Sequence, residues 1–207
     1  MGNCIVVGAI DVNVKIEKHE DDFLIAADKG YLNCLKQNLD VDLLIGDFDS
    51  LKIVPDNIEK IKLNEIKDDT DVFDALMEGI KRGYKSFILY GVIGGRFDHT
   101  FANIQILLFL KNKGYEAKII DEDRTYIILE NESIELPKKE RGYLSVFSLS
   151  AISHGVTLKN LKYELKNATL TSEFPLGVDN EYIDKSPFIE VKDGKILLIY
   201  SFYNAIF

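Results

Sequence analysis

The chain has few of the residues that build several common kinds of site. Its 207 residues include two cysteines, three histidines and no tryptophan. Cys4 and Cys34 both lie in apolar surroundings and no Cys-x-x-Cys spacing occurs, so we expect two reduced core residues rather than a disulfide. The histidines are scattered along the chain, which argues against a zinc site.

Basic residues and long apolar runs are also scarce. The chain has 25 Lys and Arg against 34 Asp and Glu, a formal net charge of −9. A nucleic-acid-binding protein normally carries a basic face, so we expect no such partner. No apolar stretch is long enough to span a membrane and no signal peptide is evident, so we expect a cytoplasmic protein without membrane contact.

Two common enzyme signatures are missing as well. The sequence contains no Gly-x-x-x-x-Gly-Lys-[Ser/Thr] loop, which excludes a P-loop kinase. It also contains no Gly-x-Ser-x-Gly or cysteine–histidine signature that would indicate acyl chemistry.

The first part of the chain alternates strand and helix patterns. Short apolar runs that predict strands lie at residues 4–8, 23–27, 43–45, 61–63, 87–90 and 117–120. Helical spacing of apolar residues predicts helices at 30–37, 69–82 and 98–113. This order predicts an α/β domain over residues 1–125, with a mostly parallel, Rossmann-like sheet and flanking helices.

The pattern changes after residue 125, where no convincing helix follows. Strand-like runs lie at residues 126–129, 133–136, 142–149, 156–158, 161–165, 188–191 and 195–200. Turn signals such as Pro137-Lys138 and Asp193-Gly194 separate them. We therefore expect a small all-β sandwich domain over residues 126–207.

Three acidic clusters, at residues 46–50, 67–71 and 94–99, lie at or just beyond the ends of apolar runs. In the first, Asp47 and Asp49 stand two positions apart, so in an extended segment both carboxylates face one side. Carboxylates at the carboxyl ends of strands lie where open α/β sheets bind ligands, and several together repel one another unless a cation lies among them. The clusters predict a metal-dependent site for a Mg²⁺-chelated phosphate. For this pair alone, an ordinary strand-ending turn stays an open alternative.

The other two clusters begin predicted helices. Asp68 and Asp71 lie three positions apart and so share a helix face, although simple N-capping is an alternative. In the third cluster, two glycines let the backbone approach a ligand, and Arg96 can grip phosphate oxygens at a helix start that favours anions. Asp98 as an N-cap and His99 as an ordinary first-turn residue are the alternatives there.

Taken in order, Asp28 and these clusters resemble the thiamine pyrophosphokinase family. The segments that carry the resemblance are Gly-Asp-Phe-Asp-Ser at 46–50, Asp-Asp-Thr-Asp at 68–71 and Gly-Gly-Arg-Phe-Asp-His at 94–99. Residues 154–165 and 176–181 resemble that family's β-sandwich domain. The resemblance implies a homodimer that transfers the β,γ-pyrophosphoryl group of ATP to the hydroxyl of thiamine, giving thiamine diphosphate and AMP. It also implies a site shared between the α/β domain of one subunit and the sandwich of the other.

The resemblance implies roles for individual residues. The implied magnesium-binding acids are Asp28, Asp47, Asp49 and Asp71. The residues expected near ATP are Lys67, Asp68, Thr70 and His99. Arg96 and Asp98 are expected to contact phosphate and substrate, and the implied catalytic set is Asp47, Asp49, Asp71, Arg96 and Asp98. Asp179 and Asn180 are expected in the thiamine pocket.

The chain departs from the family pattern in two places. Asp179 stands where the family usually has serine, and without tryptophan an aromatic wall over thiamine has to come from tyrosine or phenylalanine. Two alternative functions stay open: a pyrophosphokinase for another hydroxymethyl heterocycle such as a pterin, and a non-catalytic sensor of nucleotide or thiamine.

Overall fold

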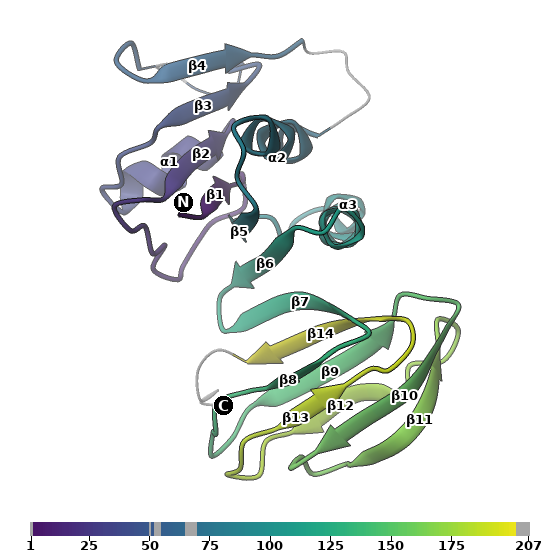
Figure 1. Cartoon of the computed structure of the whole chain (residues 1–207). Coiled ribbons are helices and arrows are strands. Elements are labelled where there is room, and N and C mark those ends of the chain that lie inside the picture. The colour runs from purple at the N-terminus through teal and green to yellow at the C-terminus, as the bar shows by residue number, and fades with distance from the viewer. Residues whose placement is uncertain (1, 50, 52–54, 65–69, 202–207) are drawn as a thin grey trace. The chain divides into compact units, whose positions relative to one another are not determined.

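The computed structural model describes residues 2–49, 51, 55–64 and 70–201. The chain divides into two compact units, residues 1–122 and 123–207, which we call the front unit and the rear unit (Figure 1). The predicted domain boundary, after residue 125, falls just inside the first strand of the rear unit. Among the described residues, no helix combines the length and the apolar character needed to cross a membrane.

The front unit is built on a parallel sheet. Its strands are β1 (Cys4–Val7), β2 (Phe23–Ala27), β3 (Leu43–Gly46), β4 (Glu59–Lys62), β5 (Ser86–Tyr90) and β6 (Glu116–Asp121). They lie in the order β6-β5-β1-β2-β3-β4, and each neighbouring pair runs parallel. The chain builds outward from β1 through β4 and then returns to the other side of β1. The strand order therefore reverses between β1 and β5, the point where open sheets of this kind form a ligand-binding crevice.

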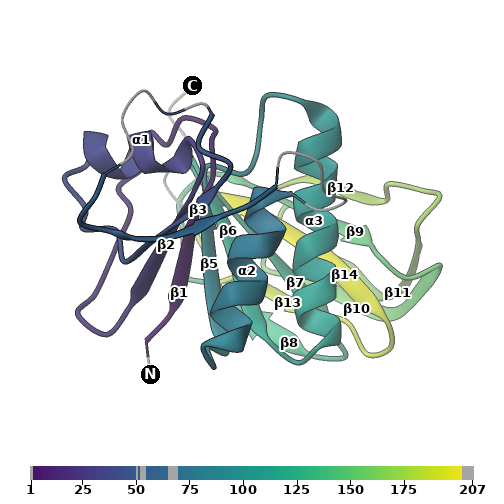
Figure 2. The same ribbon diagram turned by 90° about the horizontal axis from the view of Figure 1, so that it is seen from above.

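Helices cover both faces of the front sheet. They are α1 (Gly30–Lys36), α2 (Asp71–Lys81) and α3 (Phe97–Asn112). Figures 1 and 2 show α1 on one face and α2 and α3 on the other. Because side chains alternate along a strand, Ile5 and Val7 of β1 share a face and join the apolar cluster that contains Cys34 of α1. Burial on both sides explains why β1, β2 and β3 appear in the sequence as continuous apolar runs.

Both cysteines lie inside the front unit, as predicted. Cys4 of β1 and Cys34 of α1 are buried and free. Burial disfavours the charged thiolate and raises the pKa of each thiol to about 12. We therefore expect both to behave as inert core residues rather than as nucleophiles.

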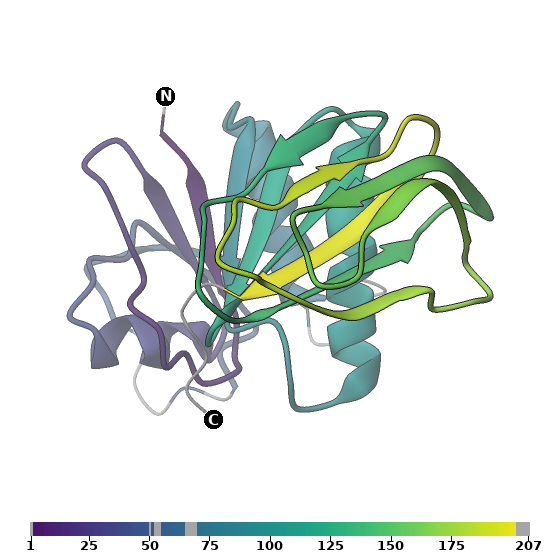
Figure 3. The ribbon, with the colours of Figure 1, turned by 90° about the horizontal axis from the view of Figure 1, so that it is seen from below.

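The rear unit is a sandwich of antiparallel strands (Figure 3). Its strands are β7 (Arg124–Glu130), β8 (Ser133–Glu135), β9 (Tyr143–Ser148), β10 (Ile152–Lys159), β11 (Leu165–Thr171), β12 (Gly177–Glu181), β13 (Phe188–Glu190) and β14 (Lys195–Ser201). Four lie in the order β12-β9-β14-β7 and the other four in the order β11-β10-β13-β8, all paired antiparallel. Leu144 and Val146 of the first sheet share a buried apolar cluster with Val156 and Leu158 of the second.

The structure corrects the predicted fold class in one respect. Parallel pairing is confined to the front unit, so the chain as a whole is a strand-rich, mixed α/β protein and not a mostly parallel one. The mostly parallel description was made for residues 1–125, where it agrees with the pairing, and the eight strands of the rear unit make the chain as a whole mixed.

In the rear unit, two strands were not predicted and one predicted strand is wrong. Of the predicted strand at 161–165, residues 161–164 lie outside any strand, Leu161 makes only an isolated bridge to Tyr182, and Leu165 begins β11. The strands β11 and β12, which the sequence did not indicate, are the outermost strands of their four-strand groups. In β11 only Leu170 is buried, so the chain there has no apolar alternation to mark a strand.

Candidate functional site

Three of the predicted acids converge at the ends of two neighbouring strands. Carboxylate oxygens of Asp28, Asp47 and Asp49 lie within 4.8 Å of one another. Asp28 follows β2, while the other two follow β3, which pairs parallel to β2 with Ala27 opposite Ile45. The backbone N–H of Asp28 donates to the Ile45 carbonyl at 2.8 Å, which keeps the two strand ends together. Parallel pairing therefore brings together acids that are about twenty residues apart in the sequence.

The backbone around these acids is shaped for close approach. Gly46 has a φ of 154°, and a Cβ placed there would lie 3.2 Å from the Cα and Cβ of Asp28. A larger residue at this position would push the strand ends apart. One residue further on, Asp47 Oδ1 accepts a hydrogen bond of 3.1 Å from the Asp49 N–H, an Asx-type turn. The turn interpretation and the metal interpretation of this pair are therefore compatible.

A cavity of about 460 Å³ opens beside these acids. Six of the predicted site residues line it: Asp28, Asp47, Thr70, Asp71, Arg96 and His99. Asp49 lies in the carboxylate cluster but is not a lining residue, and Asp98 lies outside the lining. Most of the other lining residues come from the segments after β1 and β5, at the point where the strand order reverses, and Ala27, Val72 and Asn103 complete the wall. The predicted residues Lys67 and Asp68 lie outside the described residues.

Two helix N-termini border this cavity. Thr70 is the N-cap of α2, and its side-chain oxygen accepts a hydrogen bond of 3.2 Å from the Phe73 N–H. Capping therefore explains Thr70 in part, while Asp71 begins the helix and also lines the cavity. At α3 the N-cap position is held by Arg96, so the alternative that Asp98 is the cap is wrong; Asp98 lies in the first turn. Helix N-termini carry partial positive charge and favour bound anions.

Arg96 and Asp98 form a forked ion pair at the start of α3. Arg96 Nη2 lies 2.5 Å from Asp98 Oδ2, and Arg96 Nε donates to Asp98 Oδ1 at 3.2 Å. The guanidinium lowers the pKa of the Asp98 carboxyl, and the carboxylate raises the pKa of Arg96. The two side chains are 74% and 62% exposed, so a phosphate arriving from solution can reach the fork of Arg96.

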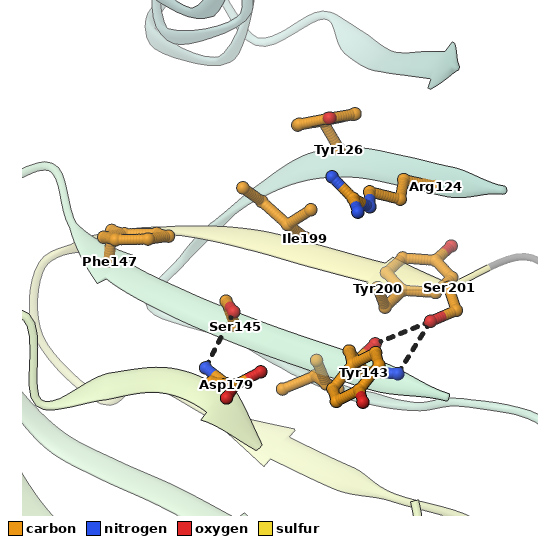
Figure 4. Close-up of a pocket in the computed structure, with 10 residues that line it drawn as sticks. Arg124, Tyr126, Tyr143, Ser145, Phe147, Asp179, Ile199, Tyr200 and Ser201 are labelled. Atoms are coloured by element: carbon orange, nitrogen blue, oxygen red, sulfur yellow. Dashed lines mark hydrogen bonds between the residues drawn. The ribbon is translucent and has the colours of Figure 1, made fainter. Parts of the chain in front are cut away.

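The rear unit has a separate pocket of about 380 Å³ (Figure 4). Four aromatic residues line it: Tyr126 of β7, Tyr143 and Phe147 of β9, and Tyr200 of β14. Its charged residues are Arg124 on β7 and Asp179 on β12, which occupy opposite ends of the four-strand order β12-β9-β14-β7. The pocket is thus aromatic over its floor and carries opposite charges at its two edges.

The structure separates the two predicted thiamine-pocket residues. Asp179 lines the pocket with a positive φ of 61°, and its N–H donates to Ser145 Oγ at 3.1 Å. Asn180 is 3% exposed and is not a lining residue. Its Nδ2 donates to the Tyr163 carbonyl at 2.6 Å, and its Oδ1 accepts from the Tyr163 N–H at 3.0 Å. A direct contact between Asn180 and substrate stays a prediction.

The sequence interpretation missed the other residues of the rear pocket. Arg124, Tyr126 and Ser145 lie within ordinary strands of alternating pattern, and nothing in their neighbours distinguishes them. The missing tryptophan did indicate that tyrosine or phenylalanine would supply an aromatic wall. The pocket has four tyrosine or phenylalanine residues among its lining residues, and their contact with thiamine stays a prediction.

Comparison with known proteins decides the family. The family model for the thiamin pyrophosphokinase catalytic domain matches residues 15–119, and the model for its vitamin B1 binding domain matches residues 131–196. The chain belongs to the thiamine pyrophosphokinase family. The first match covers most of the front unit with its acidic cavity, and the second includes Asp179 and Asn180. Thiamine pyrophosphokinases are transferases, so the sensor alternative loses its support.

Individual relatives agree with this assignment. The thiamine pyrophosphokinase of Bacillus subtilis is 28% identical over 184 residues, which are 86% of each chain. A solved thiamin pyrophosphokinase family protein from Enterococcus faecalis is 27% identical, with a TM-score of 0.84 over 97% of this chain and 99% of that one. The solved structure of the Bacillus subtilis enzyme has a TM-score of 0.84 at 24% identity, again over 97% and 99% of the chains.

Proposed function

We propose that this thiamine pyrophosphokinase transfers the pyrophosphoryl group of ATP to the hydroxyl of thiamine in the cytoplasm, giving thiamine diphosphate and AMP. One observation carries the proposal. The match to the catalytic model falls on the unit whose cavity combines clustered acids, Arg96 and two helix N-termini. Phosphoryl transfer is catalysed mainly by positioning and by electrostatic stabilisation, and these groups supply both.

The acids fit a magnesium ion. Asp28, Asp47 and Asp49 already offer oxygens within 4.8 Å of one another, and Asp71 lines the same cavity. Magnesium prefers oxygen ligands and is commonly shared between carboxylates and substrate phosphates. We propose these four as its ligands. A cation bound there offsets the negative charge of the phosphate chain.

Side chains and helix N-termini of the protein then bind the rest of the phosphate chain. Arg96 exchanges Asp98 for phosphate oxygens, which fit its planar fork equally well. The N-termini of α2 and α3 add favourable dipoles, and Thr70, His99 and the undescribed Lys67 and Asp68 belong to the proposed ATP site. In the reaction, the thiamine hydroxyl oxygen attacks the β-phosphorus of ATP and releases its proton. The bond from that phosphorus to the bridging oxygen of the α-phosphate breaks, and AMP leaves.

The rear pocket is the proposed thiamine site. Thiamine carries a permanently cationic thiazolium ring, and aromatic side chains attract such cations through their negative faces. Asp179 adds a negative charge, and as an ionised carboxylate it can accept a hydrogen bond from the amino group of the pyrimidine. Asn180 contributes by holding the backbone of Tyr163 beside the same strand. This pocket favours thiamine over a neutral pterin.

We also propose that the protein is a homodimer whose active site uses the front cavity of one protomer and the rear pocket of its partner. Large apolar side chains stay exposed on the rear unit, among them Tyr143, Leu176 and Val178. Exposed apolar patches mark contact surfaces. The test mixes two inactive variants, Asp47→Asn and Asp179→Arg, after dissociation and reassociation. Shared sites restore about a quarter of wild-type activity, because half of the dimers then carry one intact site. No recovery, or a fully active monomer, contradicts the proposal.

Product analysis tests the reaction itself. The protein is incubated with ATP, Mg²⁺ and thiamine, and the products are identified by ³¹P NMR. We expect AMP and thiamine diphosphate in equal amounts, and no product when EDTA is present. Release of ADP, or activity that survives EDTA, contradicts the assignment. Parallel incubation with a hydroxymethylpterin tests the alternative acceptor.

A further inference from the structure

The segments after β1 and β5 form one wall of the acidic cavity, and they are hydrogen-bonded to each other. Ala9 and Ile10 line the cavity from the first segment, and Gly91 and Val92 from the second. The Ile10 N–H donates to the Gly91 carbonyl at 3.0 Å. Gly91 has a φ of 64°, and a Cβ there would lie 2.6 Å from the Ile10 carbonyl oxygen, so the contact requires glycine. We call residues 8–12 and 91–94 the two-loop wall.

A buried asparagine ties the first loop to α1. Asn33 is 3% exposed, and its Nδ2 donates to the carbonyls of Gly8 at 3.0 Å and Ile10 at 2.8 Å. Its Oδ1 accepts from the Val12 N–H at 3.3 Å. One amide side chain therefore makes three hydrogen bonds to a five-residue segment, and the curve of that segment depends on it.

A second buried asparagine ties the other loop to α3. Asn103 is 6% exposed, lines the cavity, and donates from Nδ2 to the Val92 carbonyl at 2.7 Å. One turn earlier in α3, Thr100 Oγ1 accepts from the Gly94 N–H at 3.0 Å and lies 3.1 Å from the Gly94 carbonyl oxygen. Each half of the wall is thus fixed by polar side chains from a neighbouring helix.

We propose that Asn33 and Asn103 are positioning residues for the reaction: they hold the two-loop wall in the shape that receives the phosphate chain of the nucleotide. This inference rests on the proposed function. The wall lies at the reversal of strand order and faces the acids that hold the phosphate's counter-ion. Removing either amide leaves buried carbonyls unpaired and lets the loop shift, and displacements near 1 Å cost about 100-fold in rate.

Gln37 offers a matched control for Asn33. It lies one turn after Asn33, at the end of α1. Gln37 Nε2 donates to the Val14 carbonyl at 2.8 Å, and its Oε1 accepts from the Ile16 N–H at 2.8 Å. It makes a longer bond of 3.4 Å to the Val12 carbonyl. Gln37 therefore holds the segment between β1 and β2 by the same chemistry, but its two shorter bonds reach Val14 and Ile16, which lie outside the two-loop wall and do not line the cavity.

The experiment compares Asn33→Ala, Asn103→Ala and Gln37→Ala in the full-length protein. Melting temperature, the KM for ATP, the KM for thiamine and kcat are measured for each. We expect all three to melt at lower temperature. The two asparagine variants lose at least about tenfold in kcat/KM for ATP while the KM for thiamine stays within about twofold, and Gln37→Ala stays within about twofold in both. If Asn33→Ala fails to fold, Asn33→Asp keeps the volume but cannot donate when ionised.

Two results overturn the inference. One is an Asn33 variant with the same kinetic constants as Gln37→Ala. Asn33 would then stabilise the fold without positioning the wall for the reaction. The other is an equal rise of both KM values, which indicates general loosening. Calorimetric titration with ATP and Mg²⁺ separates this inference from the proposed function. A wild-type protein that binds ATP tightly but forms no AMP overturns the proposed function. In that case, weaker ATP binding by the asparagine variants still supports their role in holding the two-loop wall. A wild-type protein that binds no ATP overturns both proposals.

Discussion

The two units carry their functional residues in different parts of their strands. In the front unit they lie where strands end and helices begin, as Asp47 follows β3 and Arg96 precedes α3. In the rear unit the pocket residues project from strand interiors, as Tyr126 does from β7 and Ser145 from β9. A strand end gathers several polar residues into one short segment, whereas a strand face takes only every second residue. Sequence motifs therefore reveal the proposed phosphate site and conceal the proposed acceptor pocket.

The chemistry of the two cavities differs in the same way. The front cavity holds clustered carboxylates that repel one another unless a cation lies among them. The rear pocket has four aromatic residues and only one charge of each sign. Charged groups that meet the transferred phosphate control turnover strongly, while an aromatic pocket distributes its binding energy over several side chains. We therefore expect single substitutions to lower turnover strongly in the front cavity and less strongly in the rear pocket.

The largest effect is expected for Asp47→Asn. Losing one carboxylate weakens the binding of the cation that offsets the charge of the pyrophosphoryl group, so kcat should fall at least about 100-fold with an unchanged circular dichroism spectrum. Asp56→Asn is the matched control, because Asp56 is a front-unit acid in an exposed ion pair with Lys60, outside the cavity and the two-loop wall. Near-normal turnover of Asp47→Asn would return this residue to the turn interpretation.

A smaller but clear loss is expected for Arg96→Lys. Lysine keeps the charge but not the planar fork, so kcat/KM for ATP should fall about tenfold or more. Arg82→Lys serves as the control, since Arg82 also pairs through its fork, with Glu59 and Glu78, at the far end of α2. Equal effects of the two substitutions would show that the loss does not depend on the position of Arg96 in the cavity.

In the rear pocket, Asp179→Ser should leave thiamine turnover within about tenfold, the scale of one net hydrogen bond. The same change should reduce the preference for thiamine over a neutral hydroxymethylpterin, because the negative charge attracts only the cationic ring. Asp184→Ser, at an exposed acid paired with Lys138 in the same unit, should change neither. A native preference for the pterin would overturn the choice of substrate.

The smallest effect concerns titration of Asp98. Arg96 lowers the pKa of this carboxyl below its ordinary value of 3.8, so the ion pair persists as the pH falls past that value and is lost only at the lowered pKa. Arg96→Gln should raise the pKa of Asp98 back toward 3.8, as followed by NMR of the side-chain carboxyl. Arg82→Gln should leave it unchanged. An Asp98 pKa that is the same in Arg96→Gln and wild type would show that the pair does not persist in solution.

Much of the front unit was predictable, and less of the rear unit. The inner strands β1, β2 and β3 of the front sheet are buried on both faces, so runs such as 23–27 stand out from the sequence. The strand β11 buries only Leu170, and no periodicity could reveal it. Asn33 and Asn103 were missed because one amide within a helix pattern gives no sign that it is buried. Asn180 was assigned to the pocket by resemblance, yet its side chain holds Tyr163.

A comparison of Michaelis constants tests the division of labour between the two units most directly. The KM for ATP and the KM for thiamine are measured for Arg96→Lys and for Tyr126→Ala, alongside the wild type. We predict that Arg96→Lys raises only the KM for ATP and that Tyr126→Ala raises only the KM for thiamine, each by about tenfold or more. The opposite assignment, or equal rises of both constants in both variants, would contradict it.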